Sequence, residues 1–443
     1  MFCGKASTEW GGLSRFVRPT GGDVPFLWPR AAFRVRLAPR SGTKPDRQRQ
    51  YRAEPMTEMA HGTVLVQSGE AILPRWWRTV DRVTLACIFT LFLIGLLLGF
   101  AASPPLAARN GLDPFYYVYR QAFFGGLAFV AMILTSMMSP QQVRRLGVLG
   151  FFGAFAALAL LPVFGTDYGQ GAARWYSLGF ASVQPSEFLK PVFIIFTAWM
   201  VAASQEINGP PGKTLSLVVM MVVVGFLVMQ PDYGQGALVL FSWMVIYFVA
   251  GAPIWILGLI SIIVAGGGIL AYTTVEHVAR RIDGFLSAEV EANTQLAYAE
   301  NAIREGGFFG TGLGEGSVKW TLPDAHTDFI IAVAAEEYGL VLVLLIIALF
   351  AIVALRGFFR LMRERDPFTR LAGAGLAAVF ALQSIINMGV AVRLLPAKGM
   401  TLPFVSYGGS SLIATGVAVG MLLAFTRSRP QGDISDILFQ RRG

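Results

Sequence analysis

Glu187 and Lys190, at the start of a long apolar run, carry opposite charges three residues apart. In a helix this spacing places both side chains on one face, and Ser186 is positioned to cap the first turn. The pair could be a structural ion pair that braces neighbouring helices, or part of a cavity wall that contacts a charged substrate. Ionisable groups within apolar sequence are costly to bury and commonly mark a functional cavity.

Arg174 and Trp175 close a glycine-containing segment, 169–175, shortly before that run. A guanidinium beside an aromatic ring suits a lipid headgroup that carries phosphate, with a sugar ring stacked nearby. The ordinary belt of aromatic residues at a membrane surface would account for Trp175 alone. It accounts less well for Arg174.

Asp328 lies in the polar segment 322–329 and opens another apolar run. There its carboxylate would meet the positive end of a helix dipole, either as a simple N-cap or as a reactive acid. Glu336 and Glu337 follow about 12 Å further along the helix, at 1.5 Å per residue. Two adjacent acids at that depth must face a protein interior, because lipid cannot solvate them.

Two further polar segments interrupt the apolar sequence. The segment 230–234 holds Asp232 between two short apolar runs, and 395–411 combines the cation Lys398 with a stretch rich in glycine and serine that includes Ser406. Short runs that meet at a proline or glycine break usually indicate backbone that leaves the helix inside the protein or beside a cavity. Five polar breaks at one face of a helical bundle predict a functional site.

The composition defines the surroundings of these residues. Of the 443 residues, 54% are hydrophobic and 14% are charged, whereas a soluble domain has about 25% charged residues. A soluble fold of this size could not bury so much apolar surface. This excludes a cytosolic enzyme of two nucleotide-binding halves, a disulfide-rich secreted module and a disordered scaffold. The chain is predicted to be an all-α polytopic membrane protein.

Ten apolar runs are long enough, or nearly so, to cross a bilayer. They cover residues 80–102, 115–137, 143–164, 187–203, 214–229, 235–250, 254–274, 328–356, 369–393 and 403–426. The predicted organisation is a basic tail (1–55), a juxtamembrane segment (56–79), a transmembrane domain (80–426) with one long loop (275–327), and a C-terminal tail (427–443). A long ordered loop is usually functional.

Arginine residues fall mainly in the connections on one side of this bundle, which orients both termini toward the cytoplasm. The polar breaks and the loop 275–327 then lie on the extracytoplasmic side. Most of the formal net charge of +9 resides in 1–55, where eleven Lys/Arg face four acids. The basic balance therefore indicates no nucleic-acid partner, and the three histidines and two cysteines do not suggest a zinc site.

Taken in order, the polar segments resemble the SEDS (shape, elongation, division and sporulation) family of peptidoglycan polymerases over roughly residues 80–426. The resemblance implies a ten-helix glycosyltransferase that polymerises lipid II at the outer face of the cytoplasmic membrane. It also implies a class B penicillin-binding transpeptidase and other division proteins as partners. The segment 395–401 is closer to the cell-division members, which act at the septum, than to the elongation members. The matching segments are 173–175, 184–190, 230–234, 323–329 and 402–411.

By this resemblance Asp328 is the catalytic residue, a general base for the 4-hydroxyl of the acceptor sugar. Cations in the site would stabilise the leaving pyrophosphate. No cofactor is firmly implied, although a divalent Mg or Mn ion could bridge phosphate oxygens. A lipid II flippase, a non-catalytic scaffold and an elongation-type polymerase remain alternatives. The residues implied to bind substrate are Arg174, Trp175, Glu187, Lys190, Asp232, His326, Thr327, Lys398 and Ser406.

The tail 1–55 is expected to be dispensable, because it contains none of the apolar runs and the resemblance does not extend to it. A gene that starts at Met56 should therefore complement loss of the full-length gene, measured as growth and division of the depleted strain. Failure of the shorter gene at equal expression would show that the basic arm contributes, for example by binding anionic lipid.

Overall fold

The computed structural model describes residues 72–166, 173–179, 181–286, 294–322, 324–396 and 399–428. Regular structure in these ranges is helical, apart from one short antiparallel pair of strands. In chain order the elements are α2 (Ile72–Thr79), α3 (Arg82–Arg109), α4 (Tyr116–Met137), α5 (Pro140–Phe164), β1 (Tyr176–Ser177), β2 (Ser182–Val183), α6 (Pro185–Ala203), α7 (Gly212–Met229), α8 (Tyr233–Val249), α9 (Ile254–Thr274), α10 (Glu276–Leu286), α11 (Gln295–Gly306), the 3-10 helix η1 (Val318–Trp320), α12 (Ile330–Leu361), α13 (Pro367–Ala391) and α14 (Gly409–Thr426).

Ten of these helices coincide with the ten apolar runs, which confirms the all-α polytopic fold. Among the described residues, nine helices are long and apolar enough to cross a membrane, and the shorter α8, of 17 residues, is the tenth. The last span begins at Gly409 rather than at 403. The difference arises because residues 399–408 form a loop whose backbone carbonyls bond to side chains of other helices.

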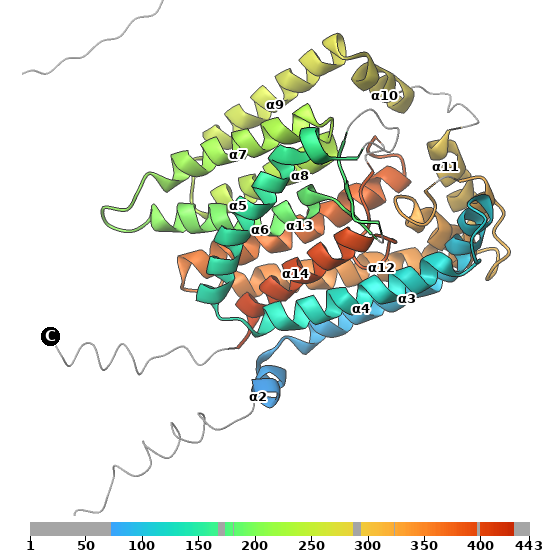
Figure 1. The fold of residues 1–443 in the computed structure, drawn as a ribbon, viewed down its shortest axis with the longest axis horizontal. Coiled ribbons are helices and arrows are strands. Elements are labelled where there is room, and N and C mark those ends of the chain that lie inside the picture. The colour runs from blue at the N-terminus through green and yellow to red at the C-terminus, as the bar shows by residue number, and fades with distance from the viewer. Residues whose placement is uncertain are drawn as a thin grey trace, which may run out of the picture. The chain divides into compact units, whose positions relative to one another are not determined.

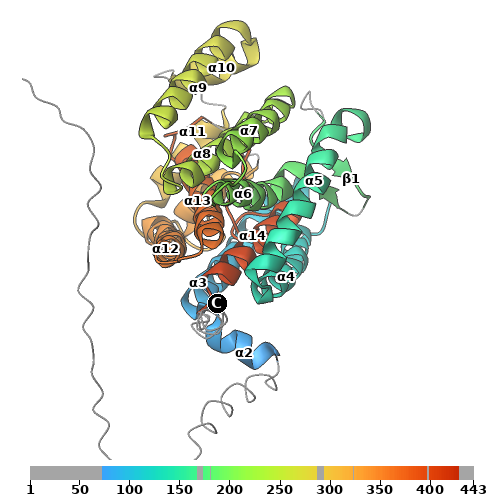
Figure 2. The same cartoon turned by 90° about the vertical axis from the view of Figure 1, so that its left-hand side faces the viewer.

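Helix α14 runs through the middle of the bundle, between α4 on one side and α6 and α13 on the other (Figures 1 and 2). Glycines allow this close approach. A Cβ on Gly416 would lie 2.4 Å from the carbonyl oxygen of Ala128, and one on Gly420 would lie 1.9 Å from Thr135 Oγ1. In lipid, where no hydrophobic force drives helices together, such close packing is a main source of association.

Helix α9 differs from the others because none of its residues is buried. Its principal contacts are with α10 and α8, and it stands beside the bundle in both views (Figures 1 and 2). Its apolar side chains, such as Ile262 at 70% exposed, are of the kind that lipid covers. The polar segments are therefore positioned by the other nine helices.

The amino ends of α6, α8, α12 and α14 gather at one end of the bundle, the end that also carries α10 and α11 (Figure 1). Each of these helices begins directly after, or within, one of the predicted polar segments. At the opposite end, buried Asp81 binds Arg356 at 2.7 Å and Arg360 at 3.1 Å. This cluster joins the start of α3 to the end of α12.

Gly339 interrupts α12 with a non-helical conformation, φ 75° and ψ −172°. The loop that follows α11 fills the interruption with its own backbone. Leu340 N donates to Gly307 O at 3.0 Å, and Thr311 N donates to Glu336 O at 2.8 Å. The backbone groups freed by the break are therefore bonded to the loop, as burial in a membrane protein requires.

Replacement of Gly339 by alanine should destabilise the protein strongly. A Cβ would sit 2.3 Å from the carbonyl oxygen of Phe308, and the positive φ is strained for alanine. We expect a loss of roughly 1–3 kcal/mol, measured as a lower thermal unfolding midpoint in detergent. Gly153→Ala is the matched control, because no atom lies within 4 Å of its added Cβ. Equal midpoints for the two variants would contradict this account of the break.

Candidate functional site

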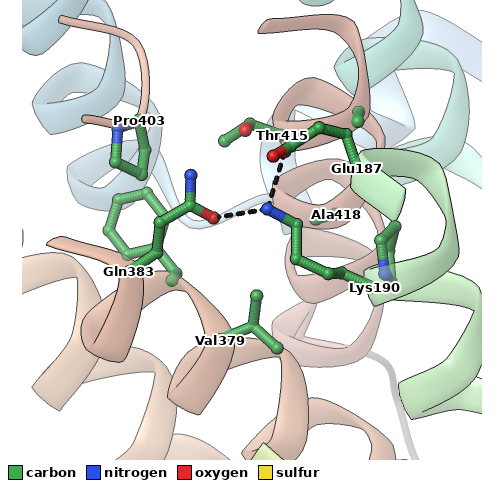
Figure 3. A pocket seen from close by; sticks show the side chains of 10 residues that line it. Glu187, Lys190, Val379, Gln383, Pro403, Thr415 and Ala418 are labelled. Atoms are coloured by element: carbon green, nitrogen blue, oxygen red, sulfur yellow. Dashed lines mark hydrogen bonds and ion pairs between the residues drawn. The ribbon is translucent and has the colours of Figure 1, made fainter. Parts of the chain in front are cut away.

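Glu187 and Lys190 form a buried ion pair at the centre of a four-residue network. Both side chains are 3% exposed, and Lys190 Nζ lies 2.6 Å from Glu187 Oε2. Lys190 also donates to Gln383 Oε1 on α13 at 2.9 Å, as Figure 3 shows. Gln235 on α8 donates to the other carboxylate oxygen at 2.6 Å. The predicted shared face of Glu187 and Lys190 is correct, and the pair connects three helices.

A small cavity lies beside this pair. Figure 3 shows Lys190 reaching between Glu187 and Gln383, with Pro403 and Thr415 on the same wall. The two interpretations of the ion pair are thus compatible, since the pair both braces the helices and lines a cavity. The remaining lining residues are Pro191, Val379, Phe380, Ala414 and Ala418.

Arg174 is directed at the backbone turn between α7 and α8. Its Nε donates to Gln230 O and its Nη2 to Pro231 O, both at 3.0 Å. Gln230 in turn donates through its side chain to Leu158 O at 3.0 Å. The predicted break between two short spans is therefore stabilised by two side chains: Arg174 binds its backbone carbonyls, and Gln230 links it to α5. Two of the guanidinium nitrogens that we assigned to phosphate are engaged with this turn.

Asp232 is 8% exposed and caps the start of α8, where its carboxylate accepts from Gln235 N at 3.5 Å. Gln184, which precedes α6, donates to the other oxygen at 3.3 Å. Asp232 therefore adjoins the Glu187 network through Gln235. Trp175 is half-buried and pairs through its backbone with Thr166, next to the short strands.

The expected cap of α6 was wrong, and of the two alternatives for Asp328 the simple N-cap does not hold. Gln184, not Ser186, is the N-cap residue of α6, because Pro185 occupies the first helical position. The Ser186 hydroxyl is buried and has no hydrogen-bond partner among the described residues. At α12 the N-cap is Phe329, and no side chain caps the helix. Asp328 therefore lies before the helix start without acting as its cap.

The loop that carries Asp328 is fastened to the loop before α14. Ser406 Oγ donates to Thr327 O at 2.5 Å and accepts from Leu402 N at 2.9 Å. Tyr407 N donates to His326 O at 2.9 Å. Ser406 is 2% exposed, so the structure places its hydroxyl between two backbone segments. Thr327 contributes its carbonyl oxygen to this junction.

His326 packs into a triangle of rings with Tyr117 and Tyr407, at centroid distances of 5.4 and 5.6 Å. Burial lowers the pKa of His326 to about 4, although the negative charge of Asp324 works in the other direction. The imidazole is therefore neutral at physiological pH. A neutral ring among half-buried aromatics suits contact with a sugar face better than binding of an anion.

Asp328 lies two residues before α12, beside a second and smaller cavity. Burial raises the pKa of its carboxyl to about 7, and the negative charge of Asp324 adds to the shift. A carboxyl with this pKa is partly ionised near neutral pH, which is the range in which a general base works best. Among the predicted site residues that the structure describes, Asp328 best combines access to a cavity with a perturbed acidity.

Helix α13 joins the two groups of residues. Gln383 Nε2 donates to Thr401 O at 3.0 Å, and Asn387, one turn further along, donates to Met400 O at 2.5 Å and to Asp328 O at 3.0 Å. A continuous series of hydrogen bonds thus runs from Glu187 through Lys190 and α13 to the Asp328 loop. The predicted residues of α6, α8 and the two loops belong to one connected site.

Glu336 and Glu337 are buried, 0% and 2% exposed, as the sequence predicts. Glu336 accepts from the backbone N–H groups of Val318 and Lys319, and Glu337 forms an ion pair with the Lys319 ammonium. These acids hold η1 and its loop against α12. They support the site from outside the two cavities.

Three amide residues of the site were not predicted from the sequence: Gln235, Gln383 and Asn387. A usable signal was present, because amide side chains are unusual in apolar runs, and Gln383 and Asn387 are spaced four residues apart on one helical face. Lys398 lies outside the described residues. Within the described ranges no group of three His, Cys, Asp or Glu side chains could hold a metal ion.

The chain is similar to known proteins over most of its length. Residues 81–431 match the family model of FtsW, RodA and SpoVE, described as cell cycle protein. A probable peptidoglycan glycosyltransferase FtsW of Caulobacter vibrioides is 43% identical over 357 residues, 80% of this chain and 91% of that protein. The corresponding protein of Alkalilimnicola ehrlichii is 36% identical over 360 residues, 78% and 89% of the two chains.

Two solved structures share the fold. One belongs to work on a peptidoglycan synthase complex that coordinates polymerization and crosslinking; it is 27% identical, with a TM-score of 0.66 over 80% of this chain and 99% of that one. The other is the rod shape determining protein RodA of Thermus thermophilus, 26% identical with a TM-score of 0.57 over the same shares. The resemblance drawn from the five polar segments is confirmed, and the chain belongs to the FtsW, RodA and SpoVE family of cell cycle proteins.

Proposed function

We propose that this protein is a peptidoglycan glycosyltransferase that polymerises lipid II into glycan strands. The observation that carries the proposal is Asp328, a half-buried carboxyl beside a cavity with a pKa of about 7. The chain belongs to a family in which the two relatives described above are named probable peptidoglycan glycosyltransferases. The active face is the extracytoplasmic one, both termini are cytoplasmic, and the protein works at the division septum.

In the proposed reaction Asp328 takes the proton from the 4-hydroxyl of the acceptor sugar. The oxygen then attacks the anomeric carbon of the donor, the new glycosidic bond forms, and the bond to the polyprenyl pyrophosphate breaks with its electron pair. A single displacement of this kind inverts the anomeric configuration. The base must lie within hydrogen-bond reach of the hydroxyl, and Asp328 lines a small cavity together with Asn387 and Gly399.

The leaving pyrophosphate needs positive charge where its own charge develops. Lys190, which lines the larger cavity, and Lys398, which directly precedes the loop 399–408 in sequence, are the proposed sources. Arg174, which binds the backbone turn between α7 and α8, would contribute further positive charge. Within the described residues no group of three His, Cys, Asp or Glu side chains could hold a divalent cation, and no step of the proposed reaction passes through one.

A lipid II flippase is the competing function. A transporter of this type needs a site near the bilayer midplane with access that alternates between the two sides. Here the predicted site residues lie at the amino ends of α6, α8 and α12 and in the adjoining loops, all at one end of the bundle. This arrangement favours the polymerase.

The proposed partner is a class B penicillin-binding transpeptidase, which would crosslink the emerging strand.

Replacing Asp328 by asparagine should abolish glycan synthesis while leaving the fold intact. The amide keeps the shape of the carboxyl but cannot accept the proton.

In the wild-type protein, the ionised form of Asp328 is the active one, so kcat/KM should rise with pH and level off above about 7, the pKa of Asp328. Below that value it should fall about tenfold per pH unit. Polymerisation of labelled lipid II by the purified protein measures both effects, and full activity of Asp328→Asn would refute the assignment.

Exchanging the charges of Glu187 and Lys190 separates their two roles. Either single reversal places two like charges side by side in the interior. Leaving one buried charge unpaired already costs about 3–5 kcal/mol, so either reversal should lower the thermal midpoint. The double variant, Glu187→Lys with Lys190→Glu, should recover part of the stability. It should recover little polymerisation, because pyrophosphate responds to the position of each charge. Restored glycan synthesis in the double variant would show that the pair is only a brace.

A further inference from the structure

Asn387 occupies a special position between the two loops of the site. It lies on α13 and is 2% exposed. Its side-chain Nδ2 donates to the carbonyl oxygen of Asp328 at 3.0 Å and to that of Met400 at 2.5 Å. One amide group therefore holds the backbone of the Asp328 loop and the backbone of the loop before α14.

These two bonds fix the orientation of the amide, since only the NH2 group can donate to carbonyl oxygens. The other atom, Asn387 Oδ1, is buried and has no hydrogen-bond partner within the described part of the chain. A buried acceptor without a partner is costly, roughly 1–3 kcal/mol. Such an atom calls for a specific explanation, such as a ligand or an ordered water.

The surroundings of Asn387 favour a ligand. Asn387 lines the same small cavity as Asp328, together with Gly399 and the apolar side chains of Ile386, Val390 and Met400. Of the described residues that line this cavity, Asp328 and Asn387 alone have polar side chains. A molecule that presents a hydroxyl to Asp328 therefore brings its neighbouring polar groups toward Asn387.

We propose that Asn387 is a substrate-positioning residue whose Oδ1 accepts a hydrogen bond from a hydroxyl or amide N–H group of the acceptor sugar. The bond orients the sugar so that the attacking hydroxyl faces Asp328. This inference rests on the proposed polymerase function and names a contact within that site. The side chain thus serves both partners of the reaction, because its Nδ2 fixes the base and its Oδ1 fixes the acceptor.

Gln121 provides a matched control. It is also a buried amide, 2% exposed, and its Nε2 donates to Val405 O in the same loop at 3.0 Å. It belongs to α4 and does not line the Asp328 cavity. A substitution of Gln121 therefore removes a comparable loop contact and leaves the proposed sugar contact in place.

The test compares Asn387→Leu with Gln121→Met in the full-length protein, with lipid II as the probe. Both variants should lower the thermal midpoint. Only Asn387→Leu should raise the KM for lipid II, by about tenfold, the effect of one lost hydrogen bond to a ligand. The same difference should appear as weaker equilibrium binding of lipid II when both substitutions are placed in the Asp328→Asn background, where turnover is blocked.

If Asn387→Leu does not fold, Asn387→Ser carries the same expectation, because its hydroxyl still offers a donor to the loops. Equal effects of the Asn387 and Gln121 variants on lipid II affinity, or no effect of either, would overturn the inference. Asn387 would then be a loop contact whose Oδ1 binds only water. Wild-type protein that neither binds nor polymerises lipid II would instead overturn the proposed function itself.

Discussion

The ion pair between Glu187 and Lys190 is the interaction on which the arrangement of the site depends. Two charges buried in an apolar bundle are tolerated only when they neutralise each other and their remaining hydrogen-bonding capacity is met. Gln235 and Gln383 meet it from two other helices. The cost of burying the charges thereby fixes the relative positions of α6, α8 and α13, and with them the walls of the larger cavity.

The second part of the site is held by side chains that bind backbone. Asn387, Ser406 and Gln121 each bond to carbonyl oxygens of the two loops, so the loops are tied down without regular structure of their own. Irregular backbone is stable at membrane depth only when its polar groups are satisfied inside the protein. The same bonds place the Asp328 carboxyl at a cavity rather than within a helix.

The membrane-spanning helices could be predicted from the sequence, because ten long apolar runs leave little choice of fold. It also located the polar segments, since charges such as Lys190 are conspicuous in apolar surroundings. It could not predict which partners satisfy them, because Gln383 reaches Lys190, and the Thr401 carbonyl reaches Gln383, only after three distant segments pack together. The exact first residues of the helices could not be predicted either. At α6, Pro185 occupies the first helical position, so the N-cap is Gln184 and not Ser186.

The break at Gly339 divides α12 into two parts that differ in how their amide protons are protected. Most amides of the helix are bonded within the helix itself, but Leu340 N and Val341 N donate to carbonyls of the loop at Gly307 and Phe308. Departure of the loop would expose these two amides to solvent exchange while the turns on either side stay closed. The exchange rate of these two backbone protons therefore measures how often the loop after α11 leaves the helix that follows Asp328.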